Sequence, residues 1–173
     1  MDAGFLLRFK AFLIDYLLLL GYGVLLLVFN VFLFPQSQNL FTGSLWLAQF
    51  TGFVMVTLPV SIYFIISDSL FNGQSFGKRK MGIRTIGENG SALSLGRAVF
   101  RVALKFFPWE LSHFLVYRLT ALGEMEAPVS YYLIGGIIYA LIILYIATAI
   151  FTKKKQSLYD IIAKTQVVKI RAT

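Results

Sequence analysis

The sequence is poor in the residue types on which most soluble enzymes rely. It contains no cysteine and a single histidine, so disulfide bonds and thiolate metal sites are excluded. It also has no recognised nucleophile motif, and we expect neither an enzyme nor a cofactor. Only 14% of its 173 residues are charged. This share is well below that of an ordinary soluble domain and is typical of a membrane protein.

Apolar residues make up 58% of the chain and are gathered in long runs. Three runs are long enough, at about 1.5 Å per residue, to cross a hydrocarbon core of roughly 30 Å. They are Ala11 to Phe34, Leu45 to Ile66 and Tyr131 to Phe151, and a fourth run with several charges covers Ala98 to Leu119. The sequence therefore predicts an all-α membrane protein in one domain, residues 1–173, built as a bundle of about four transmembrane helices.

Lysine and arginine are unevenly distributed between the loops. They are frequent at the N-terminus, in Ser67 to Arg97 and after Thr152, and are absent from Pro35 to Ser44 and Thr120 to Ser130. The positive-inside rule then predicts that both termini are cytoplasmic, which requires an even number of crossings. We interpret the fourth run as a third span in chain order. The alternative is an amphipathic helix lying in the cytoplasmic interface.

Two residues mark features of this charged run. Pro108 in its middle removes a helical hydrogen bond and frees the carbonyl of Leu104, which favours a kink or a break. Ser94 is the expected N-cap residue.

A β-prone segment separates the second run from the charged run. Lys80 to Ile86 predicts a strand, Asn89-Gly90 is a typical hairpin turn, and Ser91 to Leu95 is the expected return strand. The sequence thus predicts a small cytoplasmic β-hairpin over about residues 80–95. Thr165 to Ile170 is a further β-prone stretch that is able to join the same sheet.

Asp15 is the most unusual residue of the apolar runs, because a charge at the centre of a spanning helix costs roughly 2.5 to 3.5 kcal/mol. Arg97, Arg101 and Lys105 repeat every four residues, so they form a stripe that is expected to face Asp15 and Asp68. We predict an ion or proton site made of Asp15, Asp68, Arg101 and Lys105. The alternative is a set of ion pairs that only locks the packing of the helices.

Glu110 and His113 lie three residues apart and are predicted to share a polar network or a proton relay. A single such pair is not enough for a metal centre of the helix-bundle type, so no metal site is expected.

Clusters of basic residues explain the net charge of +8 without nucleic-acid binding, because they lie at the edges of the apolar runs. They are predicted to contact anionic lipid headgroups. Their members are Lys78, Arg79, Lys80, Lys153, Lys154 and Lys155. Arg79 follows Lys78 where a phosphate-binding loop requires Ser or Thr, so nucleotide binding is not expected.

Three segments carry a family resemblance. FLLRFKAFLIDYLL, GQSFGKRKMGIRTIGENGSALSLGRAVFR and SLYDIIAKTQVV, in that order, resemble the RDD family of bacterial membrane proteins. The arginine and two aspartates that name the family match Arg8, Asp15 and Asp160. Tyr159 and Lys164 depart from the histidine and glycine that members often carry. The resemblance implies a bacterial cell membrane location and transport of small ligands, with monovalent cation/proton exchange as its most concrete suggestion.

In the exchange hypothesis, Asp15 alternates between a proton and a small cation, and Arg101 or Lys105 supplies the competing charge. The alternative is a non-transporting partner that regulates or anchors another membrane protein. Four helices are few for alternating access in one chain, so we also expect a homo-oligomer.

Overall fold

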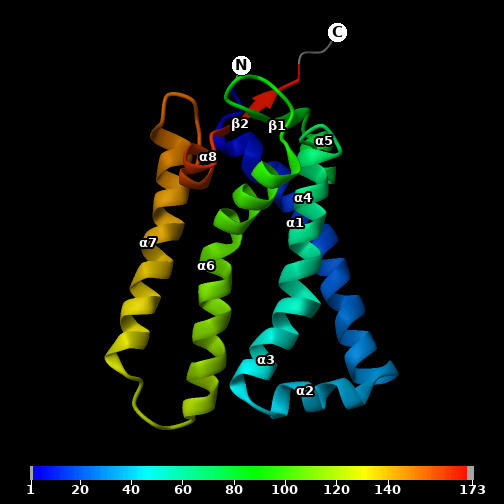
Figure 1. Cartoon of the computed structure of the whole chain (residues 1–173), viewed down its shortest axis with the longest axis vertical. Coiled ribbons are helices and arrows are strands. Elements are labelled where there is room, and N and C mark those ends of the chain that lie inside the picture. The colour runs from blue at the N-terminus through cyan, green and yellow to red at the C-terminus, as the bar shows by residue number, and fades with distance from the viewer. Residues whose placement is uncertain (1, 171–173) are drawn as a thin grey trace.

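Long helices dominate the computed structural model, which describes residues 2–170 (Figure 1). Four long helical segments form the bundle. They are α1 (Phe5–Val28), continued by a π-helical turn (Phe29–Leu33); α3 (Leu45–Gly52), continued by a π-helical turn (Phe53–Thr57) and α4 (Leu58–Ser69); α6 (Leu95–Leu122); and α7 (Val129–Phe151). The predicted bundle of about four helices is confirmed.

Three of these segments have the length and apolar composition needed to cross a membrane: Phe5–Leu33, Leu45–Ser69 and Val129–Phe151. Few of their side chains are buried within the chain, as expected for helices whose outer faces contact lipid. The fourth, α6, is 28 residues long and extends beside α4 and α7 (Figure 1).

The short elements connect the long helices at the two ends of the bundle. A 3₁₀ turn (Pro35–Gln38) and α2 (Asn39–Thr42) lie at the same end as the loop between α6 and α7 (Figure 1). The opposite end, which we call the sheet end, holds α5 (Phe76–Lys80), β1 (Ile83–Gly87), α8 (Leu158–Ile162) and β2 (Thr165–Lys169).

The predicted small sheet is confirmed, but its second strand is not the one expected next to Asn89-Gly90. β1 pairs antiparallel with β2, from Ile83 opposite Lys169 to Gly87 opposite Thr165. The turn does form, because the Gly87 amide donates to the Ser91 carbonyl at 2.9 Å. The predicted return strand, Ser91 to Leu95, is instead a loop that leads directly into the N-terminus of α6.

A serine cap begins α6, and a hydrogen bond from α7 allows the helix to continue through its proline. Ser94 caps the helix as predicted, its hydroxyl accepting from the Arg97 amide. Pro108 lies inside a continuous helix, so of the predicted kink or break the break is absent. The Leu104 carbonyl that Pro108 leaves without an amide partner accepts the Tyr145 hydroxyl at 2.6 Å. A hydrogen bond from α7 thus replaces the missing one.

The apolar contacts at the sheet end join the sheet to the start of α1. Ala3, Ala11, Ile83 and Val167 are buried together. α5 lies directly on α1 at Gly77, where an added Cβ would come within 2.0 Å of the Ala11 carbonyl oxygen. The absence of a side chain at residue 77 is therefore what permits this close approach.

Replacing Gly77 with alanine is expected to force α5 away from α1. Overpacking of this kind costs about 1 to 3 kcal/mol, so the Gly77→Ala variant should unfold at a lower temperature than the wild type in mild detergent. Gly96→Ala is the matched control, because a Cβ on Gly96 meets nothing within 4 Å. Equal melting temperatures for the two variants would contradict the close packing at Gly77.

Candidate functional site

Three buried carboxylates lie at the sheet end of the bundle. Asp15 belongs to α1, Asp68 to α4 and Asp160 to α8, and each is at most 2% exposed. Buried carboxylates need partners, because an unpaired charge in a low-dielectric interior is costly. Asp68 and Asp160 pair with cationic side chains, whereas Asp15 accepts hydrogen bonds from neutral donors.

Asp160 is held by two arginines from different helices. Its Oδ1 lies 2.7 Å from Nη2 and 2.9 Å from Nε of Arg101, and its Oδ2 pairs with Arg8 of α1. Asp160 also completes the capping box of α8 with Ser157. Burial alone would raise the pKa of the Asp160 carboxyl, but Arg101 and Arg8 outweigh it and keep that pKa below its ordinary value.

Asp68 is also held by two cations. Its Oδ2 lies 2.5 Å from Nη1 of Arg101, and its Oδ1 lies 2.5 Å from the ammonium of Lys78 on α5. Lys78 also donates to the Thr85 hydroxyl at 2.7 Å. Burial lowers the pKa of the Lys78 ammonium, and the neighbouring Asp68 offsets this effect only in part.

Arg101 therefore connects the two carboxylates through separate edges of one guanidinium group. We call Arg8, Asp68, Lys78, Arg101 and Asp160 the charge network. Its members come from α1, α4, α5, α6 and α8, so it joins five helices at one level of the bundle.

Asp15 stands apart from this network. Its carboxylate accepts from the Tyr63 hydroxyl at 2.8 Å, the Ser75 hydroxyl at 2.6 Å and the Gly77 amide at 2.7 Å. These three neutral donors attach α4 and α5 to α1. The structure thus brings Asp68 and Arg101 together as predicted, whereas Asp15 makes no ion pair within the described part of the chain.

Lys105 is the remaining member of the predicted ion site. Its ammonium lies 3.5 Å from the centroid of the Phe64 ring and 5.2 Å from that of Phe106. Among residues 2–170 no carboxylate comes within 4.0 Å of it. A cavity of about 180 Å³ lies between α1, α6 and α7. Its lining includes Lys105, Asp15, Lys78 and Arg101.

The predicted pairing of Glu110 with His113 has a third partner. Oε1 of Glu110 accepts the Thr57 hydroxyl and lies 3.4 Å from Nδ1 of His113. Thr57 is the last residue of the π-helical turn between α3 and α4, a local geometry that is frequent at functional sites.

Polar contacts continue along α6 beyond this point. Arg118 donates to the Gln49 side chain of α3 at 2.9 Å, and its guanidinium also lies 4.9 Å from the Trp46 ring. We call the α6 residues Arg101, Lys105, Glu110, His113 and Arg118, with their partners on α3 and α4, the polar seam. Arg101 and Arg118 are 17 residues apart, so the seam extends over about 25 Å of helix.

A comparison with known proteins places this arrangement in a family. The model of the RDD family matches residues 3–164 of the chain. The chain belongs to the RDD family. It is 29% identical over 96% of its length to the uncharacterized membrane protein YteJ of Bacillus subtilis, of which it covers 80%. It is 27% identical, again over 96% of its length, to the uncharacterized protein YxaI of the same organism, of which it covers 96%. No solved structure matches the chain significantly.

Two of the three residues matched to the RDD name lie in the charge network. Arg8 pairs directly with Asp160, although 151 residues separate them in the sequence. Asp15 attaches α5 to α1 by accepting hydrogen bonds from the Ser75 hydroxyl and the Gly77 amide. The RDD protein is thus a membrane protein with several apolar helices, and the residues matched to its signature all join helices at the sheet end.

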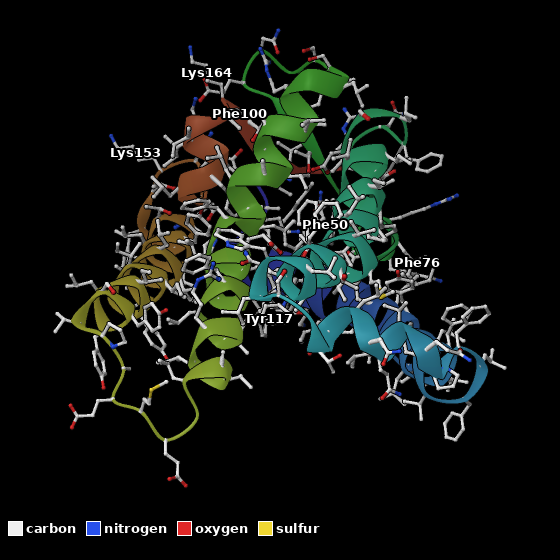
Figure 2. All side chains as sticks on the ribbon, turned by 60° about the horizontal axis from the view of Figure 1, so that its bottom comes forward. Phe50, Phe76, Phe100, Tyr117, Lys153 and Lys164 are labelled. Atoms are coloured by element: carbon white, nitrogen blue, oxygen red, sulfur yellow. The ribbon has the colours of Figure 1, made fainter. Side chains whose placement is uncertain are left out.

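The basic clusters separate into buried and exposed members. Lys78 was expected to face lipid headgroups, and this is wrong, because its ammonium is buried against Asp68. The other five remain exposed: Arg79, Lys80, Lys153, Lys154 and Lys155. Figure 2 shows Lys153 and Lys164 pointing outward from the bundle. Headgroup binding by the exposed members stays a prediction.

Several partners in the site were not anticipated from the sequence. Ser75 both caps α5 and donates to Asp15, and Tyr63 donates to Asp15 from one turn before Ser67. The local signal for Ser75 is that a serine directly precedes α5, which is typical of an N-cap residue whose hydroxyl accepts from the amide three residues later, here that of Lys78. Among the described residues no group of three or more metal-binding side chains occurs.

Replacing Asp160 with asparagine should destabilise the protein in a pH-dependent manner. Removing one partner of a buried ion pair costs about 3 to 5 kcal/mol, so Asp160→Asn is expected to unfold more readily at pH 7. The carboxylate stabilises the fold above its unfolded-state pKa of about 3.9, and this contribution disappears as the pH falls through the lower folded-state pKa.

Thermal unfolding in detergent between pH 7 and pH 3 would measure this effect. The stability difference between wild type and Asp160→Asn should shrink as the pH falls below about 4. Glu124→Gln, in the exposed loop between α6 and α7, serves as the control. A difference that stays constant with pH would show that the charge of Asp160 is not what stabilises the network.

Proposed function

We propose that this RDD protein exchanges a monovalent cation for protons across the membrane, and that Glu110 and His113, in the middle of the polar seam of α6, form its ion site. The observation that supports this proposal is the length of the seam. Ionisable side chains within membrane helices are rare and usually mark an ion or proton pathway. A seam of about 25 Å is comparable with the hydrocarbon thickness of a bilayer.

The proposal requires α6 to cross the membrane. Its support is the position of α6 beside α4 and α7, with the Lys- and Arg-poor loops at one end and the basic sheet end at the other (Figure 1). By the positive-inside rule we place the sheet end on the cytoplasmic side of the membrane and both termini in the cytoplasm. The location is then the bacterial cell membrane.

Glu110 is the carboxylate best placed to bind ions in this proposal. Its side chain is 26% exposed and its oxygen partner is the Thr57 hydroxyl, so it offers oxygen ligands of the kind that hard cations prefer. The imidazole of His113 beside it has two ring nitrogens that are able to carry a proton, so it is suited to pass protons. Binding of a proton and of a cation at Glu110 would exclude one another.

Asp15 is the less favourable candidate, although the sequence directs attention to it. Its oxygens already accept three hydrogen bonds, and the cavity beside it is lined by four cationic side chains. A metal cation at this place would be repelled. In this proposal Asp15 positions α5 rather than binding the transported ion.

Flux measurements in proteoliposomes test the proposal. Cation gradients of Na⁺, K⁺ and Li⁺ are imposed in turn, and proton movement is followed with an internal pH-sensitive dye. Wild type should show flux with at least one ion, and Glu110→Gln should reduce that flux to the protein-free level. Asp15→Asn, where folded, should retain flux, and the exposed loop variant Glu124→Gln should match the wild type.

Three outcomes would contradict the proposal. Folded wild type without flux for any of the three ions would exclude exchange of these cations. Flux at the wild-type rate in Glu110→Gln would show that Glu110 does not bind the transported ion. Loss of flux in well-folded Asp15→Asn would indicate that Asp15 binds the ion instead.

A second candidate function is a non-transporting partner that regulates or anchors another membrane protein. The observation in its favour is the charge network, in which both carboxylates are paired with cations and lock five helices together. Under this hypothesis the RDD protein should co-purify with one specific membrane protein from its own host, and Glu110→Gln should leave that complex intact.

Self-association is a separate part of the proposal. A homodimer would provide eight long helices, which suits alternating access better than four. The mass of the purified protein in mild detergent and in bilayers measures this directly, and a monomer in both would contradict it.

A further inference from the structure

The cavity at the sheet end contains an imbalance of charge. Its lining includes four cationic side chains: Arg8, Lys78, Arg101 and Lys105. Among residues 2–170, three buried carboxylates share this layer, namely Asp15, Asp68 and Asp160. With all seven side chains ionised, these residues carry one excess positive charge. Buried charges are costly unless they are compensated, and the smallest compensating species is one monoanion.

Lys105 is the cation that carries this excess. Arg8, Lys78 and Arg101 all form ion pairs with carboxylates, whereas Lys105 has none among residues 2–170. Its ammonium contacts the Phe64 ring, which compensates a positive charge only partly. None of its three N–H groups makes a hydrogen bond within the described chain, and Lys105 lines the cavity.

The wall that α1 contributes to the cavity includes an apolar part beside Arg8 and Asp15. Phe5, Phe9 and Phe12 line it, and their rings stack in sequence along the helix, with centroids 5.9 Å and 6.5 Å apart. Phe9 and Phe12 are both more than 40% exposed on the outer face of the bundle. A ligand at Lys105 would thus have an anionic group beside the cations and an apolar portion against the phenylalanines.

The size of the cavity agrees with such a ligand. Its volume is about 180 Å³, and an engineered protein cavity of about 150 Å³ accommodates benzene. A carboxylate or phosphate group with its first few carbon atoms fits into this space, and a longer tail would continue along the phenylalanines into the bilayer.

We infer that this cavity is a binding site for an oxyanion, carboxylate or phosphate, whose charge is neutralised by Lys105 and whose apolar tail packs on Phe9 and Phe12. The ligand class is an anionic amphiphile. The same anionic group is also available from a free anion, and the two sources differ in whether the tail contributes to binding. Binding of an anion in this cavity does not require the protein to exchange ions across the membrane, because it follows from the excess of cations around the cavity.

Ligand binding to the purified chain in an uncharged maltoside detergent tests this inference. The probes are dodecyl phosphate, dodecanoate, dodecanol and inorganic phosphate, and the measurement is the concentration dependence of the melting temperature. Dodecyl phosphate and dodecanoate should raise it in a saturable manner, whereas dodecanol should not. An equal effect of inorganic phosphate would keep the site and identify a free anion as its ligand.

Variants identify the residue that binds the anion. Lys105→Met should weaken dodecyl phosphate binding at least tenfold, and Lys105→Arg should stay within a few-fold of the wild type. Lys164→Met is the matched control, because Lys164 is exposed, lies outside the cavity and does not belong to the basic clusters, and this variant should bind normally. Ala149→Leu fills the cavity while leaving every charge in place, so it should also weaken binding at least tenfold.

Three results would overturn the inference. They are a response to dodecanol equal to that of dodecyl phosphate, no response of the wild type to any anionic probe, and wild-type affinity in folded Lys105→Met. If Lys105→Met does not fold, Ala149→Leu decides, and its wild-type affinity for dodecyl phosphate would overturn the inference.

Discussion

One guanidinium group, that of Arg101, pairs with carboxylates from two different elements, and the sheet end of this RDD protein depends on it. Asp68 and Asp160 are both fully buried, and each would lose one of its two cationic partners without Arg101. Arginine suits this place because its planar group offers N–H donors on two edges, which a lysine ammonium does not. The geometry therefore requires α4, α6 and α8 to meet at one level.

The remaining contacts at this level extend the same constraint to α1 and α5. Arg8 brings the start of α1 to Asp160, and Lys78 brings α5 to Asp68. Asp15 adds an attachment that uses neutral donors only. Lipid tails are as apolar as the helices themselves, so burial of apolar surface contributes little to helix association within a bilayer. Polar contacts of this kind are accordingly what position the helices at the sheet end.

The polar seam and the cavity represent two different uses of the charges on α6. Glu110 and His113 lie farther along the helix, where polar contacts are sparse and partly exposed. Lys105 lies at the level of the charge network, where cations outnumber carboxylates. One helix thus combines a locked layer, a cavity with excess positive charge and an open polar pair, and these parts are separable by mutation because they use different residues.

Composition and local spacing were enough to predict the membrane class, the approximate helices, the cap at Ser94 and the residues that match the RDD signature. For these features the sequence needs no information on long-range contacts. It also indicated that Arg101 would face Asp68, since helical periodicity places both on inward faces. It did not determine that β1 would pair with β2, or that Asp160 would be the second partner of Arg101. These contacts join residues 59 or more positions apart, and no local pattern encodes which of several compatible partners is chosen. The burial of Lys78, and the lack of a carboxylate partner for Lys105 among residues 2–170, follow from the tertiary fold alone. The reason is that the number of carboxylates that reach one layer depends on how all the helices pack together.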